Sequence, residues 1–165
     1  MVDVSVRPAS EADVPAILDI YNDAIVNSTA TFDLGPQTLD EKLTWFRDTR
    51  HPYFILVAEA DTEIVGWACL RQFRTKAAYR FTGENSVYIR GDRLKQGVGT
   101  LLAQRLVEVS RANGFHSIIA GISLPNPGSV RLHESLGFEA VGVEREVGYK
   151  FERWVDVLWM QKLLA

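Results

Sequence analysis

The chain has 165 residues and a formal net charge of −3, from 18 basic and 21 acidic residues. This length suits one folded domain, so we expect residues 1–165 to form a single domain. The acidic balance argues against a nucleic-acid binder, which usually carries an excess of positive charge.

Cys69 is the only cysteine, which excludes an intramolecular disulfide and argues against a cysteine metal site. It lies in the apolar run 64–70, a setting that favours a buried, unreactive thiol over a nucleophile. The sequence shows no signal peptide, and no apolar run approaches the ~20 residues of a membrane span. We therefore expect a cytoplasmic protein with no metal and no membrane contact.

The first quarter of the chain predicts a strand followed by two helices. The strand is expected at residues 4–7, and Ser10 before an acidic turn is typical of a helix start. Apolar residues recur at helical spacing over 17–25, which gives this helix one buried face. Residues 27–37 are polar and predict a loop, and 38–41 form a capping box that opens a second helix.

The middle of the chain predicts strands. Residues 54–58 and 64–70 are apolar and predict two strands, joined by a hairpin turn at 61–63. A basic and aromatic segment covers 71–81, and residues 84–90 predict another strand. The elements expected after it are a turn at 92–99, a helix at 100–112 ended by Asn113-Gly114, a strand at 117–122, a loop at 124–128, a helix at 129–136 ended by Gly137, and strands at 138–143 and 153–160. This order predicts an α+β fold with a central mixed, mostly antiparallel sheet flanked by helices.

The most informative segment is the glycine pair Gly97 and Gly99, between a predicted strand and a predicted helix. Free N–H groups at a helix start bind anions, and glycine lets a phosphate approach the backbone closely. Lys95 adds a positive charge. Two common phosphate motifs do not fit, because Thr100 follows Gly99 where a P-loop needs Lys, and Leu102 stands where a dinucleotide fingerprint needs Gly or Ala. A tight turn that needs glycine only for its shape is the alternative.

Two motifs in order resemble the GNAT superfamily of N-acetyltransferases. Gly97-Val-Gly99 is similar to the glycine half of its coenzyme A loop, and residues 126–138 are similar to its Asn, short helix and Leu-Gly-Phe ending. The sequence departs from the pattern at Leu94, where the superfamily has Arg or Gln. Leucine cannot donate a side-chain hydrogen bond to a phosphate, so the backbone amides of 95–100 would carry this contact.

Almost the whole chain is similar to the phosphinothricin acetyltransferase family. The matching stretches are residues 20–25, 28–32, 84–88, 124–126, 129–134 and 147–151 with Trp154. The resemblance implies a homodimer that N-acetylates an amino acid with a tetrahedral polar head, such as phosphinothricin, methionine sulfoximine or sulfone, or arsinothricin, and so confers herbicide or antibiotic resistance. It implies acetyl-CoA as co-substrate and a small-molecule amino acid as partner.

The resemblance places a catalytic carboxylate at Glu84. An α-ammonium has a pKa of ~8, so a general base assists its deprotonation at neutral pH. The alternative for Glu84 is an ion pair with a nearby Arg. His133 lies where other members carry an acid and would protonate the leaving thiolate, or it is a structural histidine. Asn126 would hydrogen-bond the pantetheine arm, or cap the helix that follows it.

The remaining site residues are implied in two groups. Expected cofactor contacts are Val87, Tyr88, Ile89, Lys95, Gln96, Gly97, Val98, Gly99, Thr100, Asn126 and Ser135, with the backbone of Val87–Ile89 acting as a strand partner for pantetheine. Expected substrate contacts are Arg74, Thr75, Lys76, Tyr79, Glu84, Asn85 and Ser86; Arg and Lys suit an anionic head, and a solvated basic loop is the alternative. Lys150 and Trp154 would reach the pocket from near the dimer interface, with Trp154 interpreted as a core residue outside the site.

Two other functions compete with amino-acid acetylation. One is acetylation of protein N-termini, against which the positive charge of residues 71–80 argues, because an open peptide groove gains little from it. The other is a non-catalytic acetyl-CoA-binding sensor, against which the presence of Glu84 and His133 counts.

Overall fold

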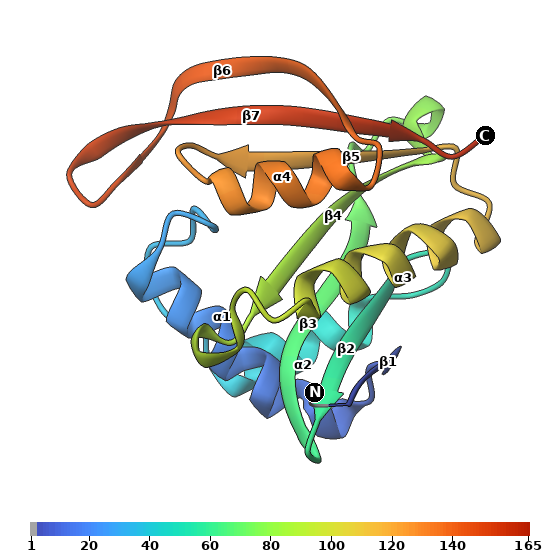
Figure 1. Cartoon of the computed structure of the whole chain (residues 1–165), viewed down its shortest axis with the longest axis vertical. Coiled ribbons are helices and arrows are strands. Elements are labelled where there is room, and N and C mark those ends of the chain that lie inside the picture. The colour runs from blue at the N-terminus through green and yellow to red at the C-terminus, as the bar shows by residue number, and fades with distance from the viewer. Residues whose placement is uncertain (1–2) are drawn as a thin grey trace.

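The computed structural model describes residues 3–165, which form one seven-stranded sheet with helices on both faces (Figure 1). The strands are β1 (Val4–Pro8), β2 (Phe54–Ala60), β3 (Glu63–Gln72), β4 (Thr82–Ile89), β5 (Ser117–Ser123), β6 (Glu139–Lys150) and β7 (Arg153–Leu163). The helices are α1 (Val14–Asn27), α2 (Leu39–Asp48), α3 (Val98–Ala112) and α4 (Pro127–Ser135), with 3-10 turns η1 (Glu11–Asp13), η2 (Ala77–Tyr79) and η3 (Gly91–Arg93).

The strand order is β1-β2-β3-β4-β5-β7-β6, and β4–β5 is the parallel pair among otherwise antiparallel neighbours. The predicted α+β class with a mixed, mostly antiparallel sheet is therefore confirmed. A parallel pair needs a crossover, and α3 provides it between β4 and β5.

Each face of the sheet has its own apolar core. Leu102 and Leu106 of α3 pack with Leu70 and Ile118 on one face, which α4 also covers. On the other face, the α1 side chains of Ile17 and Ile20 pack against residues of β2 and β3, together with aromatic residues of α2. Cys69 belongs to this second core and is buried, and burial raises the pKa of its thiol to about 11, as expected of an unreactive cysteine.

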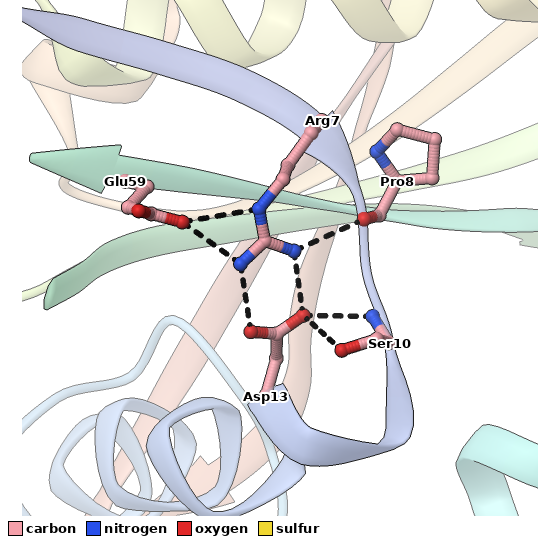
Figure 2. Close-up of polar contacts among 5 residues, drawn as sticks. All are labelled: Arg7, Pro8, Ser10, Asp13 and Glu59. Carbon is pink, nitrogen blue, oxygen red and sulfur yellow. Dashed lines mark hydrogen bonds and ion pairs between the residues drawn. The ribbon is translucent and has the colours of Figure 1, made fainter. Parts of the chain in front are cut away.

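The start of α1 is fixed to the sheet by a polar network at the β1 edge (Figure 2). The guanidinium of Arg7 donates to both carboxylate oxygens of Asp13, at 2.8 and 2.9 Å, and to Glu59 of β2. Asp13 also accepts from the backbone N–H and the hydroxyl of Ser10. These hydrogen bonds lower the pKa of Asp13 to about 2.

The predicted helix start at Thr38 and the predicted glycine ends of α3 and α4 are confirmed, and each depends on only a few consecutive residues. Thr38 accepts from the N–H of Glu41 and Glu41 accepts from the N–H of Thr38, which is the predicted capping box. Gly114 and Gly137, both with φ of 80° or more, follow the ends of α3 and α4 in the left-handed conformation.

Predicted element boundaries differ most at the C-terminal hairpin. The strands expected at 138–143 and 153–160 extend to Lys150 and Leu163, because β6 continues past a register shift between Glu144 and Gly148. This edge strand is exposed along most of its length, so it lacks the apolar alternation from which a strand is predicted. The helices expected at 100–112 and 129–136 also begin two residues earlier than predicted. No helix within residues 3–165 is long and apolar enough to cross a membrane.

Candidate active site

The candidate site lies where β4 and β5 separate. These strands pair only from Thr82–Ser117 to Glu84–Ile119, and β5 then continues with β7 alone. Figure 1 shows the two strands diverging toward their carboxyl ends. Within residues 3–165, the backbone of β4 from Asn85 to Ile89 therefore has a strand partner on its β3 side but none on its β5 side. An extended chain can bind there as an added strand.

The glycine bend opens toward the same gap. Gly97 has φ of +84°, a conformation that strains any residue with a side chain, and no atom lies within 4 Å of a Cβ built on it. The N–H of Leu101 makes the first intrahelical bond, to Gly97. Among residues 3–165 the earlier amides of α3, at Val98, Gly99 and Thr100, have no acceptor.

Side chains around Gly99 place the bend beside β4 and α4. A Cβ at Gly99 would lie 3.6 Å from Leu132 of α4 and 3.7 Å from Ile89 of β4. Lys95 is exposed, and Gln96 donates to the carbonyl of Asp92 within the same loop. Leu94, at the position where the superfamily has Arg or Gln, is 57% exposed and carries no hydrogen-bond donor in its side chain. This arrangement fits a diphosphate at the start of α3.

Glu84 is at the narrow end of the gap and forms an ion pair with Arg71, its register partner on β3. Arg71 Nη2 donates to Glu84 Oε1 at 2.9 Å. Within the described chain Glu84 Oε2 has no hydrogen-bond donor. In the sequence, Arg71 is only one residue of the basic segment 71–81. Its pairing with Glu84 follows from the register of β3 and β4.

His133 is buried in α4 and makes hydrogen bonds through both ring nitrogens. Its Nδ1 lies 2.8 Å from the carbonyl of Ser129, which can only accept, so Nδ1 carries the proton. Its Nε2 then accepts from Asn85 Nδ2 at 3.1 Å. A second proton on Nε2 would face that donor, and burial already lowers the pKa of this imidazole. The geometry favours the structural alternative, a neutral histidine that holds Asn85.

The other predicted side chains on β4 and α4 also have defined partners. Asn126 accepts from the N–H of Ser129 and thus caps α4, while Ser135 donates to the carbonyl of Leu132. Tyr88 stacks on Trp67, so only its backbone faces the gap. Since strand side chains alternate, Asn85, although predicted as a substrate contact with Glu84, lies on the opposite face of β4 and pairs with His133 there.

Four of the predicted substrate residues line one recess of about 380 Å³, namely Arg74, Thr75, Lys76 and Tyr79. Arg74 lies 4.8 Å from the ring of Phe73 and 5.4 Å from that of Tyr79, which orders the guanidinium by cation–π contact. The recess belongs to the β3–β4 connection, immediately after Arg71 and before Glu84. A recess lined by Arg and Lys suits a small molecule with an anionic head.

A bridging segment, residues 29–33, crosses the wide end of the gap and was predicted only as polar loop. Thr29 Oγ1 accepts from Ser123 at the end of β5, and the carbonyl of Ala30 accepts from the Tyr88 hydroxyl at the end of β4. The carbonyl of Thr31 accepts from Lys150 Nζ at 2.8 Å. Contacts from three strands therefore hold this segment beside the site.

The hairpin residues differ from expectation. Lys150 is buried and its ammonium points to Thr31 of the same chain. Trp154, interpreted as a core residue, is instead 62% exposed and lies against Tyr149, with ring centroids 4.8 Å apart. Its position in a long exposed hairpin, which the sequence did not predict, explains the error.

Comparison with known proteins agrees with this geometry. The chain matches the family described as "Acetyltransferase (GNAT) domain" over residues 6–159. It is 44% identical over 160 residues to the L-methionine sulfoximine/L-methionine sulfone acetyltransferase of Pseudomonas aeruginosa, covering 95% of this chain and 92% of that protein.

Two solved structures are similar over nearly the whole chain. A phosphinothricin acetyltransferase from Sinorhizobium meliloti in complex with acetyl-CoA has a TM-score of 0.94 at 34% identity, covering 98% of this chain and 89% of its own. A ribosomal-protein-alanine N-acetyltransferase from Brucella melitensis has a TM-score of 0.95 at 40% identity, covering 97% and 99%.

The chain therefore belongs to the GNAT acetyltransferase family. It is an N-acetyltransferase, an enzyme that transfers an acetyl group to an amine.

Proposed function

We propose that this N-acetyltransferase transfers acetyl from acetyl-CoA to the α-amino group of a free amino acid or a toxic analogue of the phosphinothricin, methionine sulfoximine or sulfone, or arsinothricin type. One observation carries the proposal: the recess with Arg74 and Lys76 immediately precedes β4, on which Glu84 lies where β4 and β5 part. The cationic side chains would bind the carboxylate and the polar head, leaving the amine near Glu84. Acetylation of that amine would be the means of resistance to a toxic analogue.

The residues of the gap fit acetyl-CoA, which would supply the acetyl group as an activated thioester. The amides from Lys95 to Thr100 would bind its diphosphate at the start of α3. The unpaired edge of β4 at Val87–Ile89 would hydrogen-bond the pantetheine amides. Asn126 Nδ2, which the cap of α4 leaves available, and the exposed Ser135 would contact the same arm.

Glu84 would act as the general base, directly or through a water. Its Oε1 is held by Arg71, while Oε2 is available to accept a proton from the α-ammonium. Thr75, Tyr79 and Ser86 would complete the acceptor contacts. His133 would act by keeping Asn85 and β4 in place, because both of its ring nitrogens are already engaged.

Thiol-release kinetics with acetyl-CoA and a panel of acceptors tests this function. The panel holds phosphinothricin, methionine sulfone, methionine sulfoximine, arsinothricin and an N-terminal alanine peptide. Turnover is expected with at least one amino acid, and Arg74→Gln should raise its KM with a small change in the KM of acetyl-CoA. Binding of acetyl-CoA without turnover of any acceptor would instead favour the sensor.

The second candidate function is acetylation of a protein N-terminus. The similarity to a protein described as a ribosomal-protein-alanine N-acetyltransferase supports it. The exposed, positively charged Arg74 and Lys76 favour a small anionic acceptor instead. Faster turnover of the alanine peptide than of every amino acid in the panel would reverse this preference.

We also propose that the active form is a homodimer. The β6–β7 hairpin exposes a set of apolar side chains that a second copy would cover, comprising Val141, Val143, Val147, Tyr149, Phe151 and Trp154. Sedimentation equilibrium should give twice the chain mass, and Trp154→Ser should weaken the association. A monomer at micromolar concentration would contradict the proposal.

A further inference from the structure

A buried lysine, Lys42 of α2, lies under the bridging segment on the face of the sheet that carries Glu84. Its residue surface is 3% exposed. The ammonium is 3.9 Å from the ring centroids of Tyr21 and Trp45 and 4.9 Å from that of Trp67. Within residues 3–165 no carboxylate forms an ion pair with it, so three aromatic rings surround the cation. We call this cluster the lysine box: Lys42, Tyr21, Trp45 and Trp67.

The rings of the lysine box are positioned mainly by contact with one another. Tyr21 and Trp45 each meet Trp67 edge-on, with centroids 5.9 and 5.4 Å apart. The Nε1–H of Trp67 is buried and has no acceptor in the part of the chain that the structure describes. Since no hydrogen bond fixes this ring, the central cation contributes to its orientation, and a cation–π contact is stronger when the cation is desolvated.

Two tyrosine hydroxyls connect the lysine box to the bridging segment. Tyr21 donates to the carboxylate of Asp33 and shares a hydrogen bond with Thr31 Oγ1 at 3.0 Å. Tyr88, which stacks on Trp67 with centroids 4.8 Å apart, donates to the carbonyl of Ala30. A shift of either tyrosine ring would therefore move the bridging segment at the wide end of the gap.

We infer that Lys42 is a positioning residue: its ammonium orders the lysine box and thereby holds the bridging segment in place on the face of the sheet that carries Glu84, the proposed base for the acceptor. The effect on the acceptor rests on the proposed function, while the effect on the segment does not. Lys42 touches neither of the proposed reacting groups, so its loss should raise the KM of the acceptor more than it lowers kcat.

The charge on Lys42 changes within an accessible pH range. Burial lowers the pKa of Lys42 to about 8, against a smaller opposing effect of the neighbouring Cys69 and Asp33. The other groups that face the ammonium do not titrate in the same range: burial raises the pKa of Cys69 to about 11, and burial with the Asp33 hydrogen bond raises that of Tyr21 to about 12. Burial also raises the pKa of Tyr88. The lysine box therefore loses its cation as the pH rises through about 8.

Three variants separate charge from packing. Lys42→Met keeps the length of the side chain and removes the charge, Lys42→Arg keeps a permanent charge, and Lys162→Met changes a lysine of β7 outside the cluster as a control. At pH 7, Lys42→Met should raise the acceptor KM about 5- to 10-fold with the Kd of acetyl-CoA unchanged, whereas Lys42→Arg and Lys162→Met should stay within about 2-fold of wild type. The ratio of kcat/KM of Lys42→Arg to that of wild type should rise between pH 7 and pH 9, because wild type loses the charge at position 42 and the variant keeps it. Titration of the acceptor affects both proteins equally and cancels in the ratio.

Hydrogen exchange gives a readout that needs no substrate. The N–H groups of Ala30 and Asp33 are bonded to Ser28 and Thr31 within the loop, so their exchange reports its order. In Lys42→Met they should exchange faster than in Lys42→Arg at the same pH, with α3 amides unchanged. Equal exchange in the two variants would overturn the inference even if no acceptor is turned over. An unchanged acceptor KM in Lys42→Met, or a ratio that is flat with pH, would also overturn it.

Discussion

Two of the carboxylate–arginine contacts beside the sheet differ in how many hydrogen bonds the carboxylate accepts. At the β1 edge, Asp13 accepts four hydrogen bonds from Arg7 and Ser10, and its side chain is 9% exposed. At the β4–β5 gap, Glu84 accepts one hydrogen bond from Arg71, an arginine whose side chain is 59% exposed. The first carboxylate has little remaining capacity to accept a proton, while the second keeps an oxygen available.

This difference indicates different roles for two similar pairs. Hydrogen bonds to a charged carboxylate stabilise that state, and at Asp13 they serve the fold by joining β1, β2 and the start of α1 (Figure 2). A pair with an exposed arginine contributes little to stability, because water competes for the guanidinium. Glu84 thus keeps a carboxylate oxygen that can accept a proton, whereas Asp13 does not.

The largest expected effect is on catalysis by Glu84→Gln. If Glu84 is the base, kcat should fall about 100-fold or more, because proton transfer contributes on this scale. The melting temperature should change by little. Glu108→Gln, at an exposed α3 position, is the matched control. An unchanged kcat would remove Glu84 from its proposed role and leave the ion pair as its function.

Asp13→Asn is expected to lower the stability of the fold and to leave kcat unchanged. The lowered pKa of Asp13, from 3.8 to about 2, corresponds to about 2 kcal/mol of folding free energy above pH 4. A carboxylate with a depressed pKa stabilises the folded state above its unfolded pKa, so wild type should lose this stability as the pH falls from about 4 toward 2. Urea unfolding at pH 7 should detect the loss in the variant, with kcat unchanged. A large loss of kcat in soluble, folded Asp13→Asn would contradict the division of roles.

A smaller effect is expected from Arg71→Met. Glu84 would keep its charge but lose the group that orients it, so kcat/KM should fall about 3- to 10-fold with little change in stability. Arg105→Met, which removes an equally exposed arginine on α3, should leave both quantities unchanged. If Arg71→Met were as damaging as Glu84→Gln, Arg71 would itself belong with the groups that contact the acceptor.

The smallest effect is expected at His133 and appears in the pH dependence of stability. Burial lowers the pKa of His133, so the unfolded chain binds a proton more readily and wild type should lose stability as the pH falls below about 6.5. His133→Phe should flatten the slope between pH 7 and pH 5 in urea unfolding, even if its absolute stability is lower. A kcat near that of wild type would support the structural role, whereas a large loss would return His133 to catalysis.

Short-range signals in the sequence predicted much of the fold and part of the site. The capping box at Thr38, the glycine ends of α3 and α4 and the Gly97 bend each depend on a few consecutive residues and were recognisable without the structure. The recess of Arg74 to Tyr79 is also contained in one connection. The boundaries of β6 were missed because this exposed edge strand lacks a burial pattern. The exposure of Trp154 was missed because it lies at the turn end of the long β6–β7 hairpin, outside the core.

By itself the sequence determined most of the elements and the family resemblance, and it predicted which residues bind an anion and an amine, since these inferences rest on local backbone conformation and side-chain chemistry. Only the tertiary structure decided which side chains meet. Arg71 reaches Glu84 across 13 positions and Lys150 reaches Thr31 across 119, through strand register and the return of the hairpin. The lysine box likewise exists only where α1, α2 and β3 pack together. Such contacts depend on how whole elements pack, and no pattern of neighbouring residues encodes them.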